Sequence, residues 1–289
     1  MSKITNVVIV GGTHGNEKTG VNLIRHLKND WMNPYHSFEI SFVEGNPKAI
    51  VNNLRYIDHD LNRSFNETLN DSVYEKQRVL ELHAEVKNPE TTFVIDLHTT
   101  TSNMGVTWIF SKKDLLSRQI GYRAAGGINH SYILETVTLD QDTHYVNQMA
   151  KHGIMIEVGP IAQNLAVAKT YNDTKSALLL VLEGIEVYNK TGRVDYSFKL
   201  PYFYKEMGSI DYPRDEKGNI IAMIHPDLQG QDYQQLAEKH AFLTFTGKSL
   251  GAEEVKRYYP IFVNEAAYYE KGIAFSYTDK RPIKHFFGE

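Results

Sequence analysis

The fold of this chain is decided by one stretch near its start, Val7-Val8-Ile9-Val10-Gly11-Gly12-Thr13-His14-Gly15-Asn16-Glu17. Its first four residues are all β-branched, which is typical of a strand buried on both faces of a sheet. The glycine pair that follows allows a tight turn. Residues 19–27 then carry apolar side chains at helical spacing. A buried strand, a glycine turn and a helix together predict the first unit of an α/β fold.

Apolar runs continue to alternate with helical patterns over the first two thirds of the chain. We expect further strands at 38–43, 93–97, 105–110, 131–139 and 154–158, and further helices at 75–86 and 165–188. Strands that alternate with helices predict a sheet covered by helices on both faces. Such βα units are expected to be mainly parallel, with right-handed crossovers.

The pattern changes between residues 190 and 200. From Pro201 onward, turn signals recur at short intervals, and short β-prone runs lie between them at 220–224, 241–245 and 258–263. This pattern is typical of a small β-rich unit. We therefore expect two domains, an α/β domain at 1–195 and a β-rich domain at 196–289.

Composition and charge exclude several classes of protein. Of the 289 residues, 42% are hydrophobic and 23% charged, as in a globular protein, and the formal charge of -4 argues against a nucleic-acid-binding surface. No apolar run reaches the length of a membrane span or a signal peptide, so we expect a cytoplasmic protein without a membrane partner. Cysteine is absent, so any metal must be held by His, Asp or Glu.

Three predicted strands end at residues that can bind a metal or transfer a proton. His14 and Glu17 follow the first strand, and His98 ends the strand at 93–97. Ligands bind at the carboxyl ends of strands in open α/β sheets, and two His with one carboxylate form a recognised catalytic zinc set. One alternative is that His14 caps a helix or lies in a phosphate-binding loop. Another is that the glycine-rich turn binds a dinucleotide, although the glycine spacing matches neither G-x-G-x-x-G nor a Walker loop.

Two further carboxylates belong to the same strand ends. Asp96 shares a strand face with His98, so it either braces that ligand or is satisfied by backbone groups. Glu157 ends an apolar strand, where an unpaired carboxylate is costly to bury. It is therefore expected to act as a general base or to pair with an arginine of the site.

A polar segment at 55–65 contains Arg55, Asn62 and Arg63. One arginine can polarise a carbonyl and stabilise an oxyanion, and the other can clamp a carboxylate together with the amide. Taken alone, such a segment is more often a solvated loop.

Several motifs resemble one known family. They are Gly-Gly-Thr-His-Gly-Asn-Glu at 11–17, Asp-His-Asp-Leu-Asn-Arg-Ser-Phe at 58–65, Asp-Leu-His-Thr-Thr-Thr-Ser-Asn-Met-Gly at 96–105, Glu-Val-Gly-Pro at 157–160, Asp-Tyr-Pro-Arg-Asp at 211–215 and Tyr-Tyr-Pro-Ile-Phe-Val-Asn-Glu-Ala-Ala-Tyr-Tyr-Glu at 258–270. The chain is similar to the aspartoacylase branch of the succinylglutamate desuccinylase/aspartoacylase family, which is related to zinc carboxypeptidases. The resemblance implies a carboxypeptidase-like mixed sheet flanked by helices, and a β-rich C-terminal domain that narrows the substrate channel.

The resemblance also implies a role for each matched residue. One Zn²⁺ per subunit would be bound by His14, Glu17 and His98. Glu157 would be the base that activates a water on the zinc and then protonates the leaving amine, and Arg55 would polarise the acyl carbonyl. The substrate would be held by three further residues, Asn62, Arg63 and Tyr268. A homo-oligomer that acts on a small N-acyl-amino acid is implied as well.

Three positions depart from the aspartoacylase pattern. An arginine and a tyrosine of that pattern are matched here by Asn147 and Thr143, and its second lysine near the end is matched by Gly272. These family residues serve the acidic side chain of the substrate, and the sibling aminoacylase for N-acyl-aromatic amino acids also lacks that arginine and that lysine. We therefore expect removal of the acyl group from an N-acyl-L-amino acid, with N-acetyl-L-aspartate as first candidate and N-acyl-aromatic amino acids as the alternative.

Other functions have weaker support in the sequence. Desuccinylation or peptide cleavage would use the same chemistry on other substrates. A non-catalytic protein that binds a metal or an amino acid should lack a ligand or the base, yet all are present here. A dinucleotide-binding enzyme is disfavoured by the glycine spacing.

Overall fold

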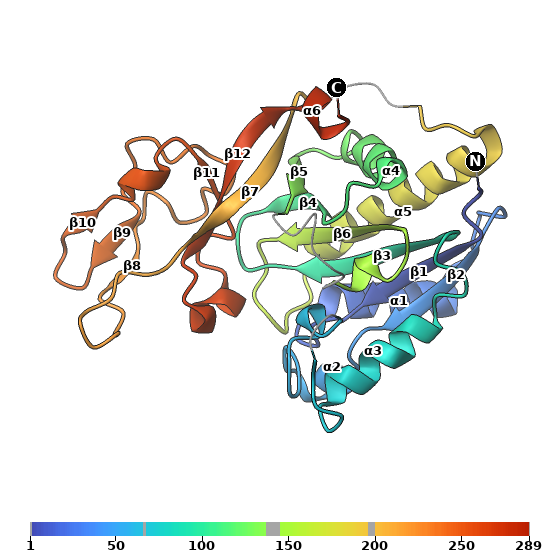
Figure 1. Cartoon of the computed structure of the whole chain (residues 1–289), viewed down its shortest axis with the longest axis horizontal. Helices are drawn as coiled ribbons and strands as arrows, with labels where there is room; N and C mark the ends of the chain where they lie inside the picture. The colour runs from blue at the N-terminus through green and yellow to red at the C-terminus, as the bar shows by residue number, and fades with distance from the viewer. Residues whose placement is uncertain (1, 66–67, 137–144, 196–199, 289) are drawn as a thin grey trace.

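The computed structural model describes residues 2–65, 68–136, 145–195 and 200–288. Within these residues, one large mixed sheet carries helices on its faces and a small sheet lies apart from it (Figure 1). The large sheet has the strand order β11-β12-β7-β5-β4-β6-β3-β1-β2. Its strands are β1 Asn6–Gly11, β2 Glu39–Glu44, β3 Thr92–Thr99, β4 Gly105–Phe110, β5 Ser131–Glu135, β6 His152–Gly159, β7 Tyr202–Ile210, β11 Tyr259–Ile261 and β12 Phe275–Pro282. The predicted α/β class with a mixed sheet is confirmed.

Helices account for the burial of both sheet faces. They are α1 Lys18–Asp30, α2 Pro47–Asn52, α3 Tyr74–Ala84, α4 Leu115–Ala125, α5 Ala168–Thr191 and α6 Ile283–Phe286. Val7 and Ile9 of β1 belong to the core formed with α1, α4 and α5, whereas Val8 and Val10 belong to the core formed with α3. The strand is buried on both faces, which explains its unbroken β-branched run. None of the described helices combines the length and the apolar character needed to cross a membrane.

Strands β1 to β6 are mainly parallel, as expected, with one antiparallel pair of neighbours. Strands β2, β1, β3 and β6 are parallel neighbours, and so are β4, β5 and β7. However, β4 runs antiparallel to β6. Helix α4 was not predicted, because its buried face includes the polar residues Ser117 and Arg118. Arg118 is paired there with Glu135 at 2.7 Å, so the apolar period of the helix is interrupted.

The C-terminal part of the chain contributes to both sheets. The small sheet consists of β8 Ala222–Ile224, β9 Phe242–Thr244 and β10 Ser249–Leu250, and a separate apolar core lies beside it. In contrast, β7 extends the large sheet parallel to β5, and β12 and β11 follow it as antiparallel strands. The short predicted runs correspond to β8, β9 and β11, whereas the longer β7 and β12 were not predicted. The boundary between 195 and 196 adjoins residues outside those described and stays a prediction.

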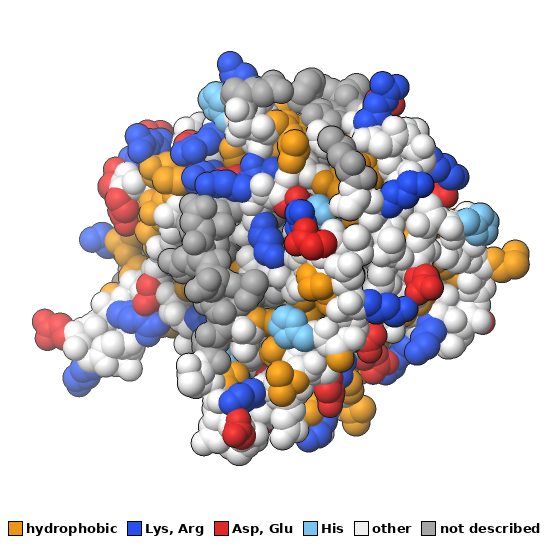
Figure 2. Space-filling view, turned by 45° about the vertical axis from the view of Figure 1, so that its right-hand side comes forward, with side chains coloured by type: hydrophobic (Ala, Val, Ile, Leu, Met, Phe, Trp, Pro, Cys, Tyr) orange, Lys and Arg blue, Asp and Glu red, His pale blue; other side chains and the backbone are white. Residues whose placement is uncertain are grey.

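The surface carries charges of both signs. Figure 2 shows Lys and Arg side chains interspersed with Asp and Glu over one face, as expected for a formal charge of -4.

Candidate active site

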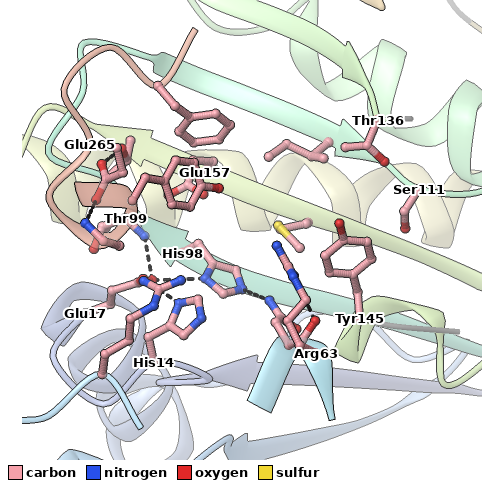
Figure 3. A pocket seen from close by; sticks show the side chains of 18 of the residues that line it. His14, Glu17, Arg63, His98, Thr99, Ser111, Thr136, Tyr145, Glu157 and Glu265 are labelled. Carbon is pink, nitrogen blue, oxygen red and sulfur yellow. Dashed lines mark hydrogen bonds and ion pairs between the residues drawn. The ribbon is translucent and has the colours of Figure 1, made fainter. Parts of the chain in front are cut away.

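The strand ends that carry the candidate residues lie side by side. Strands β1, β3 and β6 are parallel neighbours, and His98 pairs in register with Glu157. His14 lies in the loop after β1, whose backbone packs closely on α2. A Cβ on Gly15 would lie 2.1 Å from the carbonyl carbon of Ala49, so only glycine allows this approach. The fold therefore brings His14, His98 and Glu157 to one edge of the sheet (Figure 3).

Two histidines converge on one carboxylate. Nδ1 of His14 lies 2.6 Å from Oε1 of Glu17, and Nδ1 of His98 lies 3.0 Å from Oε2 of the same residue. All three side chains are buried. Burial opposes ionisation of Glu17, but the two imidazoles hold its pKa well below the usual range. The three predicted ligands are thus brought together with their donor atoms facing one another.

The outer nitrogen of each histidine lies beside a second carboxylate. Nε2 of His98 lies 2.7 Å from Oδ2 of Asp96, and Nε2 of His14 lies 3.1 Å from Oδ1 of Asp60. Metal-ligating histidines commonly donate their other N–H to a carboxylate, which orients the ring and fixes its tautomer. The donor set therefore fits a zinc ion. Of the two possibilities for Asp96, the geometry matches bracing of His98. Sequence reasoning assigned no role to Asp60, although it lies within the motif at 58–65.

Glu157 lies beside this donor set with an unsatisfied oxygen. It is buried, and its Oε1 makes no hydrogen bond within the described part of the chain. Burial raises the pKa of Glu157 well above the usual range, against the opposing effect of His98. Among described residues, no ion pair joins it to an arginine, so the geometry does not match the pairing alternative.

Arg55 borders the metal-ligand set. Its Nη1 lies 3.4 Å from Oε1 of Glu17, and its Nη2 lies 3.4 Å from Oδ2 of Asp60. Its buried Nε makes no hydrogen bond to a described residue. Burial lowers the pKa of Arg55, but the charges of Asp60 and Glu17 outweigh this effect, and the net pKa is raised. The guanidinium at the cavity wall therefore stays charged.

Asn62 and Arg63 come from the short 3-10 helix Leu61–Arg63 on the other side of the donor set. Asn62 accepts a hydrogen bond from Val146 N at 3.0 Å, and its Nδ2 lies 3.2 Å from Nε2 of His98. With the Nε2 proton of His98 directed at Asp96, this nitrogen cannot also accept from Asn62, so the amide N–H groups of Asn62 stay available for a ligand. Arg63 donates to the backbone oxygen of Asn62, and its guanidinium lies 4.8 Å from the ring of Tyr145.

Tyr268 reaches the same cavity from the C-terminal part. It lies in the 3-10 helix Ala266–Lys271, and its ring packs 5.4 Å from that of Phe262. Burial raises the pKa of its hydroxyl, and the charges of Arg63 and Arg55 oppose that rise. The hydroxyl therefore stays protonated and can donate a hydrogen bond.

Glu265 is a site residue that sequence reasoning missed. It accepts hydrogen bonds from Thr101 N at 2.8 Å, from Thr101 Oγ1 at 2.9 Å and from Thr100 Oγ1. Its other oxygen accepts from Ala267 N and caps the helix that carries Tyr268. This carboxylate therefore ties the loop after β3 to the segment of Tyr268. The motif at 258–270 contained it, but no local pattern indicated its partner.

We expect Glu265→Ala to lower the free energy of unfolding by about 2 kcal/mol, because it leaves buried donors unpaired and removes a helix cap. We also expect kcat/KM to fall at least about tenfold as Tyr268 shifts. Urea unfolding and steady-state assays measure both effects. Glu270→Ala, an exposed change in the same short helix, is the matched control. Equal effects in the two variants would contradict the role of Glu265.

The cavity has a volume of about 720 Å³, including its open mouth. Beyond the donor set, its wall includes Ile109, Ser111, Thr136, Tyr145, Met155, Glu206 and Phe262. Ser111, Thr136 and Tyr145 lie away from Glu17 and Thr99 in Figure 3. Among the described residues, the cations of the wall are Arg55 and Arg63.

The three departures from the aspartoacylase pattern fall in different places. Asn147 is buried behind the wall, where it donates to Ser111 Oγ at 3.2 Å. Gly272 follows the helix of Tyr268 with φ of 68°, a conformation that favours glycine over lysine. Thr143 lies outside the described residues. The structure therefore places neither Asn147 nor Gly272 on the cavity wall.

The chain is similar to known proteins over nearly its whole length. Residues 3–185 match the model of the succinylglutamate desuccinylase/aspartoacylase catalytic domain, and residues 200–280 match the AstE/AspA barrel-sandwich hybrid domain. A protein from Nostoc named as a probable aspartoacylase is 40% identical, over 98% of this chain and 99% of that protein. A human protein named as an N-acyl-aromatic-L-amino acid amidohydrolase is 35% identical, over 96% and 91% of the two chains. The crystal structure of murine aminoacylase 3 superposes with a TM-score of 0.85 at 30% identity, covering 97% of each chain. The chain therefore belongs to the succinylglutamate desuccinylase/aspartoacylase family.

Proposed function

We propose that the protein is a zinc-dependent amidohydrolase that removes the acyl group from an N-acyl-L-amino acid. The observation that carries this proposal is the convergence of His14 and His98 on Glu17, with the unpaired carboxyl of Glu157 beside them. The names of the relatives support the same reaction class. A cytoplasmic location and a homo-oligomeric state remain expectations.

The ion would be held by His14, Glu17 and His98, with Asp60 and Asp96 orienting the two imidazoles. When bound, zinc supplies Lewis-acid polarisation and makes water more acidic near neutral pH.

The residues of the chain supply the remaining steps. Glu157 takes the proton of the attacking water on its carboxylate and later delivers it to the leaving nitrogen. Arg55 donates hydrogen bonds to the acyl oxygen as negative charge develops there. The carboxylate of the amino acid is held by Asn62 and Arg63, while the Tyr268 hydroxyl donates a further hydrogen bond. The C–N bond breaks, and a free amino acid and a carboxylate leave.

The two predicted domains have separate roles in this proposal. Residues 1–195 supply the zinc ligands and Glu157, and residues 196–289 shape the substrate channel. Its support is that Phe262, Glu265 and Tyr268 line the same cavity as the zinc ligands.

The side chain of the substrate has two candidates. N-acetyl-L-aspartate is the first, and relatives named as aspartoacylase, such as that of rat at 37% identity, support it. The wall of the cavity favours the second, an N-acyl-aromatic amino acid. Ile109, Met155 and Phe262 form an apolar surface, and the two wall arginines are already assigned to the acyl oxygen and the α-carboxylate.

We expect the purified protein to deacetylate at least one of N-acetyl-L-aspartate and N-acetyl-L-tyrosine, to lose this activity with a chelator and to regain it with Zn²⁺. Release of the free amino acid is the readout. A large preference for aspartate would mean that a second group binds its side-chain carboxylate, whereas a preference for tyrosine would support the apolar wall. Activity that is indifferent to chelation would contradict the proposal.

A further inference from the structure

A second group of metal-ligating side chains lies on the small sheet, well separated in sequence from the active-site residues. It consists of His225, Asp227 and His240, whose ligand atoms all lie within 4.8 Å of one another. Ile224 at the end of β8 pairs with Phe242 at the start of β9. His225 directly follows Ile224, and its backbone N donates to Ala241 O at 2.9 Å, while His240 directly precedes Ala241. The antiparallel pairing therefore brings the two histidines close together.

The carboxylate of Asp227 lies at the separation expected for two ligands of one ion from each of the two imidazoles. Oδ2 of Asp227 lies 3.3 Å from Nδ1 of His225 and 3.3 Å from Nδ1 of His240. The two ring centroids are 5.0 Å apart. Ligands that lie about 2.0–2.1 Å from a tetrahedral zinc ion are separated by roughly 3.3–3.4 Å from each other. Two imidazole nitrogens and one carboxylate oxygen are also a donor set that suits zinc-like ions rather than Mg²⁺.

The surroundings of His225 favour the ligating tautomer. Its Nε2 lies 3.2 Å from Ser249 Oγ, and its Nδ1 lies 3.1 Å from Asp227 N, which donates to it. The proton is thus placed on Nε2, and the lone pair of Nδ1 faces Asp227. A cation would replace that one backbone N–H. The side chain of His240 is 51% exposed and that of Asp227 49%, so an ion reaches them from solvent, which also supplies the remaining ligand.

The two histidines delimit a loop that contacts the active-site segments. Within loop 225–240, Asp232 accepts hydrogen bonds from Asn103 N at 3.1 Å and from Val263 N at 3.0 Å. Asn103 follows the wall residues of the loop after β3, and Val263 lies two residues before Glu265. The loop therefore braces both segments that Glu265 ties together. An ion held between the two ends of the loop would stabilise the folded chain because it binds that state and not the unfolded one.

We infer that His225, Asp227 and His240 form a second divalent-cation site that prefers zinc-like ions and joins the two ends of loop 225–240. The site is independent of the catalytic set, so the inference does not rest on the proposed function. It predicts a second equivalent of zinc and a gain in stability when that equivalent binds.

The test uses the full chain, stripped with a chelator and dialysed against Zn²⁺ or against Mg²⁺. The zinc content per chain and the melting temperature are measured for wild type, His240→Gln and Glu17→Gln. His26→Gln is the matched control, because His26 is an exposed histidine with a carboxylate neighbour, Asp30 at 3.6 Å, and belongs to no group of three ligands among the described residues.

Wild type and His26→Gln are expected to bind two zinc ions, and His240→Gln and Glu17→Gln one each. The second equivalent should raise the melting temperature of wild type but not of His240→Gln, and Mg²⁺ should do neither. A His240→Gln variant that keeps as much zinc as wild type overturns the inference, whatever the total. A Glu17→Gln variant that keeps the zinc content of wild type contradicts the catalytic site and not the second one. The two proposals are therefore tested separately.

Discussion

Glu157→Ala is expected to lower kcat by about 1,000-fold or more while the zinc content of the catalytic site stays at the wild-type level. The carboxyl is buried beside the donor set and makes no ion pair to a described arginine, so its loss removes the proton carrier but none of the three ligands. General acid–base groups typically contribute about 100- to 10,000-fold. Here one group serves two proton transfers, which places the expected effect in the upper part of that range.

The measurement is single-turnover and steady-state release of the free amino acid, together with metal analysis. Glu157→Gln is the size-matched comparison, since an amide keeps the shape but carries no titrating proton, and it should be as inactive as alanine. Loss of zinc in either variant would make Glu157 a ligand or a structural group. Activity within about tenfold of wild type would refute its role as the base.

Glu17→Gln is expected to have the second largest effect, the loss of both zinc and activity. The carboxylate lies between the Nδ1 atoms of His14 and His98, and it also accepts a hydrogen bond from Thr99 N at 3.0 Å. An amide cannot supply the negative charge that the ion and Arg55 face. Zinc affinity should therefore fall by more than the roughly 10- to 100-fold that loss of an outer carboxylate typically costs.

Asp60→Asn is expected to have a smaller effect than Glu17→Gln on the same site. Asp60 contacts His14 through Nε2, the ring nitrogen that faces away from Glu17. The substitution should weaken zinc binding by about 10- to 100-fold and leave measurable activity at high zinc. Both substitutions are best combined with His240→Gln in the same chain, so that the proposed site of His225, Asp227 and His240 does not contribute to the zinc content. Equal losses from Glu17→Gln and Asp60→Asn would contradict the assignment of Glu17 as a direct ligand.

The residues of the candidate site differ in how visible they are in the sequence. His14, Glu17, His98 and Glu157 come at the ends of apolar strands, where the chemistry of an α/β sheet is concentrated, and so they were predictable. Asp60 and Glu265 lie in irregular segments, and their partners are 46 and 165 residues away in the chain. The spacing of apolar residues along the chain does not predict contacts between residues so far apart in sequence. Only the folded chain therefore identifies the partners of Asp60 and Glu265.

Local sequence was enough to predict the buried strand at 7–10, the glycine turn after it and the restriction of any metal site to histidine and carboxylate ligands. These features follow from side-chain shape, backbone freedom and the absence of cysteine, all of which act locally. Only the tertiary structure decided that β4 runs antiparallel to β6 and that β7 and β12 continue the large sheet. Strand direction and neighbour choice depend on hydrogen bonds and packing between distant segments, which local propensity does not specify. The same long-range packing brings Glu265 and Tyr268 to the cavity that His14 also lines.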